Sequence, residues 1–259
     1  MFLDTLSTFL IDGTGLELWS FALLCGVSFL GSFVTAALGL GGGTLTLASM
    51  ALFMPPVVLI PLHGVMQLGS NAGRALLMHR HVLTNIVPVF VIGTILGAAI
   101  GGQVVVVLPT YLLKSVLAAF ILYSVWIPGF QASDPGKKTF FGVGALAAFT
   151  TMFVGATGVL IAPFVLAAAK NRQEIVATHA TLMTIQHLCK VIVFGFLGFA
   201  FGSYVPFLIS VIVFGFAGTY IGKLALNRLP EHLFRSILKF ILTALAARLL
   251  YSAAAEWFT

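Results

Sequence analysis

Residues 39–44 read Gly39-Leu40-Gly41-Gly42-Gly43-Thr44, a glycine-rich break inside a long run of apolar residues. Glycine lets the backbone open and lets a ligand approach it closely. A short helix that begins at Gly43-Thr44 would point free N–H groups and the positive end of its dipole into the break. Inside a membrane these groups need a partner, so the break predicts a site for an anion or for water. A tight helix crossing between small residues is the alternative.

A polar stripe follows on the next predicted helix, and it consists of His63, Gln67, Ser70, Asn71 and Arg74. At about 100° per residue these positions fall within a sector of roughly 100°. Polar groups facing hydrocarbon are costly, so the stripe is expected to face protein or a water-filled cavity. Hydrogen bonding between helices is the alternative for the uncharged members, and snorkelling to the interface is the alternative for the arginine.

The same arrangement occurs a second time. The break Gly155-Ala156-Thr157-Gly158 precedes a second stripe of His179, Gln186, His187 and Lys190, with Met183 in the place of Gln67. A constant offset across different residue types predicts an internal duplication, and transporters are commonly built from two such repeats with the site between them. An offset of 116 positions pairs Gly39 with Gly155, Gly42 with Gly158, His63 with His179 and Arg74 with Lys190; an offset of 121 pairs Gly97 with Gly218, Gly101 with Gly222 and Leu108-Pro109 with Leu229-Pro230.

The composition is that of a membrane protein. Of 259 residues, 60% are hydrophobic and 8% are charged, and the mean hydropathy is +1.12. A soluble domain carries about a quarter charged residues. The net charge of +6 does not indicate nucleic-acid binding, because the cations lie at the ends of apolar runs and not in one basic patch. The two cysteines, Cys25 and Cys189, have no metal-ligand spacing.

Each half is predicted to hold four spanning helices and one short half-helix, because a span needs about 20 apolar residues. The first repeat is assigned to residues 1–130 and the second to residues 131–259, which begins within the polar linker 128–138. The predicted segments are 19–38, 44–54 (short), 57–78, 86–108 and 111–126, then 139–154, 159–169 (short), 175–199, 205–221 and 233–253.

The charge distribution predicts two repeats of inverted topology. With five segments per half and the N-terminus outside, the loop cations fall on the cytoplasmic side, as the positive-inside rule requires. These cations are Arg80, Lys137, Lys138, Lys170, Arg172, Lys223 and Arg228. If the short segments enter and leave on one side, the repeats are parallel, and Lys170, Arg172, Lys223 and Arg228 lie outside, against that rule.

Catalysis is not expected from this sequence. The acidic residues after Glu17 are Asp134, Glu174, Glu231 and Glu256, and all lie in loops or at segment ends. We therefore interpret the two breaks and stripes as one small-anion site, with the histidines as candidates for proton coupling because histidine titrates near neutral pH. A passive channel is the main alternative. The candidate site residues are Gly41, Gly42, Gly43, Thr44, His63, Gln67, Ser70, Asn71, Arg74, Thr157, Gly158, His179, Gln186, His187 and Lys190.

These motifs resemble the sulfite exporter TauE/SafE family of membrane permeases. The resemblance rests on Thr35-Ala-Ala-Leu-Gly-Leu-Gly-Gly-Gly-Thr44, on the glycine-spaced segment 93–112, on Val154-Gly-Ala-Thr-Gly158 and on residues 177–190. It implies transport of small sulfur-containing anions such as sulfite, thiosulfate or the organosulfonate sulfoacetate. It also implies a bacterial-type plasma membrane and no bound organic cofactor, and it leaves the exact anion, the direction of transport and homo-oligomerisation open.

Overall fold

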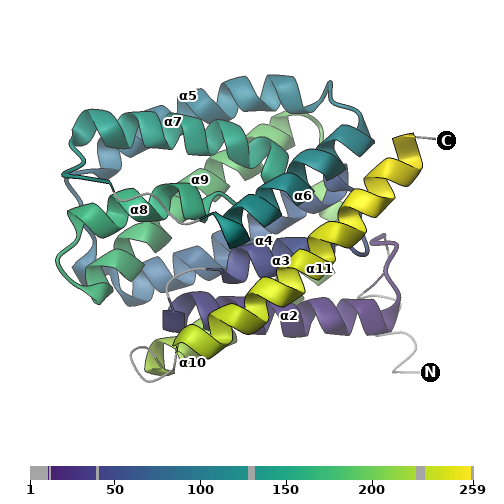
Figure 1. The fold of residues 1–259 in the computed structure, drawn as a ribbon, viewed down its shortest axis with the longest axis horizontal. Coiled ribbons are helices and arrows are strands. Elements are labelled where there is room, and N and C mark those ends of the chain that lie inside the picture. The colour runs from purple at the N-terminus through teal and green to yellow at the C-terminus, as the bar shows by residue number, and fades with distance from the viewer. Residues whose placement is uncertain (1–10, 12, 39–40, 128–131, 226–230, 258–259) are drawn as a thin grey trace.

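The computed structural model describes residues 11, 13–38, 41–127, 132–225 and 231–257. These residues form helices and no strand (Figure 1), which confirms the predicted all-helical fold. The first five helices are α2 (Leu18–Leu38), α3 (Gly42–Met50), α4 (Pro56–Leu77), α5 (Val87–Val105) and α6 (Thr110–Trp126). The next five are α7 (Lys137–Val154), α8 (Gly158–Ala168), α9 (Arg172–Phe196), α10 (Val205–Ala225) and α11 (Glu231–Trp257).

The two short segments are short helices in the structure. At 1.5 Å per residue, α3 spans about 14 Å and α8 about 16 Å, roughly half of a hydrocarbon core of about 30 Å. The prediction of 44–54 extended α3 too far, because residues 51–54 form a turn in which Phe53 N donates to Met50 O. Two 3₁₀ turns, His79–His81 and Phe201–Tyr204, complete the connections after α4 and α9.

Five of the eight predicted spans are long and apolar enough to cross a membrane by length and composition. They are Leu18–Ala37, Val87–Val105, Arg172–Phe196, Phe201–Leu224 and Ser236–Trp257. Helix α4 has 22 residues, and its polar stripe lowers its hydropathy. Helix α6 has only 17 residues, and α7 begins with Lys137 and Lys138. Large apolar side chains such as Ile95, Phe214 and Phe240 are exposed on the outer helices, as lipid contact requires.

The two halves pack on each other reciprocally. A Cβ atom built on Gly97 of α5 would lie 2.0 Å from Ala145 O of α7, and one built on Gly218 of α10 would lie 2.1 Å from Phe29 O of α2. These contacts relate equivalent positions of the two halves, because residue 218 corresponds to 97 and residue 145 corresponds to 29. Helix α5 therefore packs on α7 as α10 packs on α2, and these glycines serve close helix crossings.

Equivalent helices of the two halves run antiparallel where they touch. In α6 and α11, Lys114 Nζ donates to Glu256 Oε2 at 2.6 Å, and Trp126 Nε1 donates to Thr243 Oγ1 at 3.0 Å. In α4 and α9, Met78 packs with Val176 and Ala177. Repeats of opposite orientation would give this arrangement. The inverted membrane topology and the boundary between residues 130 and 131 stay predictions, and Gly39, Arg228 and Leu229-Pro230 lie outside the described residues.

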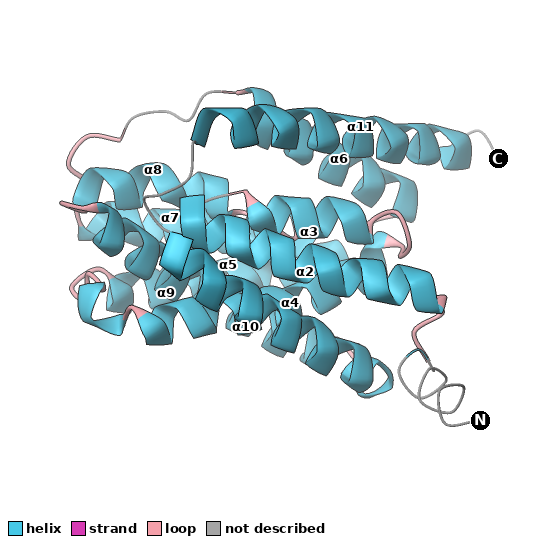
Figure 2. Cartoon of the chain, turned by 90° about the horizontal axis from the view of Figure 1, so that it is seen from below, coloured by secondary structure: helices cyan, strands magenta, loops and turns pink. Residues whose placement is uncertain are grey.

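One end of the bundle gathers the loop cations. Arg172 Nη2 donates to Ala37 O at 2.7 Å, and Lys223 Nζ donates to Leu77 O at 3.3 Å, so the last turns of α2, α4 and α10 lie beside the start of α9. Figure 1 shows these helix ends on the left, opposite the labelled N and C termini. Figure 2 shows α6 and α11 as a pair along one side, while α3 lies within the bundle.

Candidate functional site

The two glycine breaks place the N-termini of α3 and α8 inside the protein. Gly41 precedes α3 with a φ of 100°, a left-handed conformation that side chains other than glycine rarely adopt. Gly155 has a φ of 74° in the second break, and Thr157 precedes α8. Neither N-cap residue, Gly41 or Thr157, makes a side-chain capping hydrogen bond. In α8, Leu160 N donates to Thr157 O at 2.9 Å. The preceding N–H groups of α8 and the first-turn N–H groups of α3 are available to a ligand.

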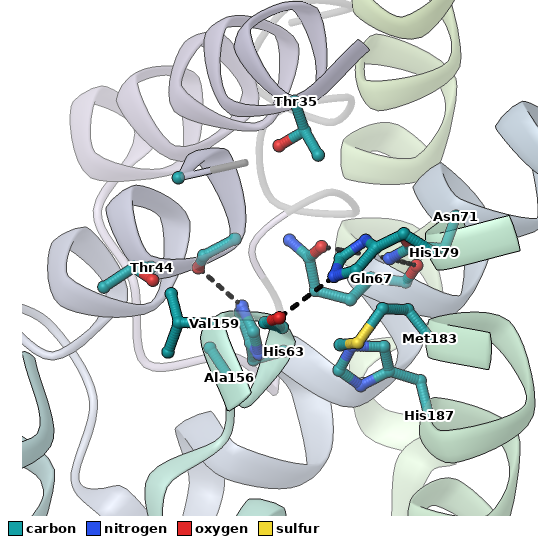
Figure 3. Close-up of a pocket in the computed structure, with 13 residues that line it drawn as sticks. Thr35, Thr44, His63, Gln67, Asn71, Ala156, Val159, His179, Met183 and His187 are labelled. Atoms are coloured by element: carbon teal, nitrogen blue, oxygen red, sulfur yellow. Dashed lines mark hydrogen bonds between the residues drawn. The ribbon is translucent and has the colours of Figure 1, made fainter. Parts of the chain in front are cut away.

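A cavity of about 40 Å³ lies between these two N-termini. A water needs roughly 10–15 Å³ of such space, so the cavity has room for a few water-sized groups. Both halves contribute to its lining, and Figure 3 shows the side chains from α4 and α9 around it. The first half provides Thr35, Gly41, Gly43, Thr44, His63, Gln67 and Asn71, and the second provides Ala156, Gly158, Val159, His179, Met183 and His187.

A chain of hydrogen bonds connects a buried cation to this cavity in the first half. Arg74 Nη2 donates to Asn71 Oδ1 at 2.6 Å. The amide of Asn71 is thereby oriented, and its Nδ2 donates to Gln67 O at 2.7 Å and to Gln67 Oε1 at 3.3 Å. With its oxygen accepting, Gln67 is left with its NH₂ group as a donor to the cavity. Each bond in such a chain polarises the next, which strengthens the last donor toward an anion.

The second half holds its buried cation differently. Lys190 Nζ donates to Gly155 O at 2.8 Å, which ties α9 to the glycine break directly. Gln186 Nε2 donates to Thr157 Oγ1 at 2.7 Å, so the residue before α8 is also fixed from α9. Neither cation lines the cavity, although both are almost completely buried.

The two buried cations have no acidic partner among the described side chains. Arg74 is 2% exposed and Lys190 is 0% exposed, and Arg74 Nη1 has no hydrogen-bond partner. An ion pair among the described residues joins Lys114 on α6 to Glu256 on α11, and neither residue belongs to the polar stripes of α4 and α9. A buried charge is costly unless a counter-charge or hydrogen bonds compensate it. This environment favours an anion.

The equivalent histidines hold the starts of the two short helices. His63 Nε2 lies 2.9 Å from Gly43 O, and His179 Nε2 lies 3.0 Å from Gly158 O. Since a carbonyl only accepts, each Nε2 carries a proton in these bonds. His187 packs edge-on against His63 with ring centroids 6.0 Å apart. Both ring nitrogens of His187 are buried without a protein partner, so they remain available to a ligand, water or proton.

The structure brings nine of the predicted site residues to the cavity lining. The other six lie behind it, and two of these follow the alternatives left open above. Ser70 accepts a hydrogen bond from Ser32 Oγ at 2.8 Å and lies 3.5 Å from Thr219 Oγ1, so it joins helices. Gly42 lies at a close helix crossing, because an added Cβ atom would meet Gly31 O at 1.7 Å. The remaining four are Arg74, Thr157, Gln186 and Lys190.

Four lining residues were not predicted: Thr35, Ala156, Val159 and Met183. A signal for Met183 was present, because it stands at the repeat position of Gln67. Val159 likewise stands at the repeat position of Gly43. Thr35 precedes the first break by only a few residues, but nothing in the sequence alone places its side chain at the cavity.

A comparison with family models matches residues 24–249 to the family described as Sulfite exporter TauE/SafE. This match covers most of the chain, including both glycine breaks and both polar stripes. Comparisons with curated proteins and with solved structures give no match.

Proposed function

The chain belongs to the Sulfite exporter TauE/SafE family of membrane transporters, and from this premise we propose that it carries a small sulfur oxyanion across a bacterial plasma membrane by alternating access. Sulfite, thiosulfate and organosulfonates such as sulfoacetate are the candidate substrates. The anion binds in the cavity between the N-termini of α3 and α8, at the interface of the two repeats, which is the usual place for a transporter site. The N-terminus lies outside, opposite the loop cations.

The observation that carries this proposal is the buried Arg74, which has no carboxylate partner among the described residues and is connected through Asn71 and Gln67 to the cavity. A guanidinium group stays charged in proteins, so an anion in the cavity compensates this charge. The chain of hydrogen bonds places the amide donor of Gln67 toward that anion. The volume of about 40 Å³ favours a compact ion such as sulfite or thiosulfate over the longer sulfoacetate.

Proton coupling is the second part of the proposal. His187 lines the cavity with both ring nitrogens free of protein partners, and its ring lies beside that of His63. A histidine in this position can take up a proton when the anion arrives and release it when the anion leaves. The role belongs to His187 first, because His63 and His179 already hold carbonyl oxygens with one nitrogen each.

The test is sulfite flux into proteoliposomes, measured with and without a pH gradient. The wild-type protein should show saturable flux that the gradient drives. Replacing Gln67 by Leu should reduce the flux strongly, whereas Ser70→Ala on the same helix should leave it nearly unchanged, because Ser70 bonds to other helices. His187→Gln should keep sulfite binding and lose the dependence on the gradient. Non-saturable flux, or equal flux in the Gln67→Leu protein, would contradict the proposal.

A further inference from the structure

The two short helices carry different side chains over their N-termini. A Cβ atom built on Gly43 in the first turn of α3 would lie 3.3 Å from Gln67 Oε1 and 3.7 Å from Gln67 Nε2. A Cβ atom built on Gly158, the first residue of α8, would lie 3.8 Å from Met183 Sδ. Gln67 and Met183 occupy equivalent repeat positions. The duplication therefore supplies an amide at one N-terminus and a thioether at the other.

The two sides of the cavity differ in the same way. The first half contributes polar side chains, among them the NH₂ group of Gln67 and the hydroxyl of Thr44. The second half contributes the side chains of Ala156, Val159 and Met183, none of which can donate a hydrogen bond. His179 already bonds Gly158 O. His187 is a lining side chain of the second half with both ring nitrogens free of protein partners, and Figure 3 shows it beside Met183.

This division restricts the anion that fits. Three oxygens can be served by Gln67, by Thr44 with the N-terminus of α3, and by His187. The Met183 side chain itself offers only carbon and sulfur atoms, where the first half has the amide of Gln67. An oxygen placed against Met183 would lose its hydrogen bonds to water and gain none from that side chain, which is costly for a charged group. A lone pair, a carbon atom or a second sulfur atom placed there makes a favourable contact with the polarizable thioether.

We propose that Met183 is the specificity-determining residue of this site, and that it admits sulfur anions with one non-oxygen position while rejecting sulfate. This inference rests on the proposed function, because it concerns the same cavity. It also fixes the orientation of the anion, with its oxygens toward α3, Gln67 and His187 and its fourth position toward the Met183 side chain.

Thiosulfate and sulfate form the matched pair that tests this inference. Both are tetrahedral dianions, and they differ by one sulfur atom in place of one oxygen. Competition against labelled sulfite is measured on the purified full-length protein, without oxygen so that sulfite is not oxidised. Thiosulfate should compete at least about tenfold better than sulfate in the wild type, since a buried polar group without a partner discriminates by this order or more. Equal competition by the two anions would overturn the inference before any variant is made.

Three substitutions of Met183 test whether its apolar side chain causes the selectivity against sulfate. Met183→Gln copies the residue of the first half and should bring sulfate competition to within about threefold of thiosulfate, because the fourth oxygen then has a donor. Met183→Thr tests the same effect with a smaller donor. Met183→Leu is the control, because it keeps an apolar wall of similar volume, and it should still reject sulfate.

The outcomes separate this inference from the proposed function. If the wild type binds none of the three anions, the proposed function fails and the inference falls with it. If the wild type binds sulfite and a folded Met183→Gln or Met183→Thr protein still rejects sulfate, only the role of Met183 is wrong. Sulfate binding by the Met183→Leu protein would also contradict it, since the volume and not the missing donor would then set the selectivity.

Discussion

The two halves of the protein place similar residues at equivalent positions and use them differently. In the first half, Arg74 bonds Asn71, and Asn71 bonds Gln67 at the cavity. In the second half, Lys190 bonds the backbone carbonyl of Gly155. Under the proposed function, the first arrangement connects a buried charge to the cavity and the second holds the glycine break in place. The anion would then be recognised mainly by the first half, and the second half would mainly support the site.

The largest difference in stability is expected between alanine substitutions at Gly42 and Gly158, which are equivalent positions of the two repeats. An added methyl group on Gly42 would overlap the backbone oxygen of Gly31, whereas on Gly158 it would meet the His179 ring at 3.1 Å. Gly42→Ala should destabilise the protein by about 3 kcal/mol, since backbone cannot move aside easily. Gly158→Ala should fold normally and bind sulfite more weakly. Thermal unfolding in detergent measures the first effect, and a Gly42→Ala protein as stable as wild type would contradict the close crossing.

Arg74 and Lys190 form the next comparison. Arg74→Gln should weaken sulfite binding by about 30-fold, because loss of a buried charge typically costs 2 kcal/mol or more. Lys190→Gln should weaken binding less and lower the stability by about 1.5 kcal/mol, since it loses a charged hydrogen bond to the glycine break. Binding titrations and thermal unfolding on both variants measure this. An equal or larger binding defect in Lys190→Gln would reverse the assigned roles.

Gln67 on α4 and Gln186 on α9 allow the two halves to be compared through the same residue type. Gln67 lines the cavity, and Gln186 bonds Thr157 behind it. Gln67→Leu should weaken sulfite binding by about tenfold, as expected for a hydrogen bond to a charged group. Gln186→Leu should weaken it by no more than about threefold, because it acts through Thr157. Titration of the two variants side by side distinguishes them, and matching losses would mean that both halves recognise the anion equally.

The smallest effect is expected at Ser70, which stands at the repeat position of Gln186. Ser70→Ala removes a hydrogen bond to Ser32 on α2. The stability should fall by about 1 kcal/mol, while the sulfite affinity stays unchanged. A clear loss of affinity in this variant would place Ser70 in the site and would weaken the distinction between α4 residues that face the cavity and those that face α2 and α10.

Much of the fold was readable from the sequence because its signals are local and repeated. The apolar runs, the glycine breaks and the constant offset between His63 and His179 predicted the long and short helices and their order. The ends of α3 were less accurate, since the apolar residues 51–54 continue the hydropathy signal into a turn. Helix α4 was predicted as segment 57–78, although its polar stripe makes it less apolar than the five helices that qualify as spans by length and composition.

The side-chain roles in the site were less predictable because they depend on tertiary contacts. The spacing put Gly42 and Ser70 with the site residues, yet both meet α2. Only the packing of α2 on α3 and α4 reveals this. The chain of hydrogen bonds from Arg74 through Asn71 to Gln67 depends on side-chain rotamers, which the sequence does not specify. Met183 is an apolar residue in an otherwise polar stripe. The structure shows that it lines the cavity beside Gly158, which the sequence did not predict.

A structure of the protein determined with sulfite bound would show directly whether the anion occupies the central cavity. We expect one anion between the N-termini of α3 and α8, within hydrogen-bond distance of Gln67 and His187, with its non-oxygen side toward Met183. An anion bound elsewhere, for example in the separate cavity of about 90 Å³ beside Arg248 and Ser252 on α11, with the central cavity empty, would contradict it.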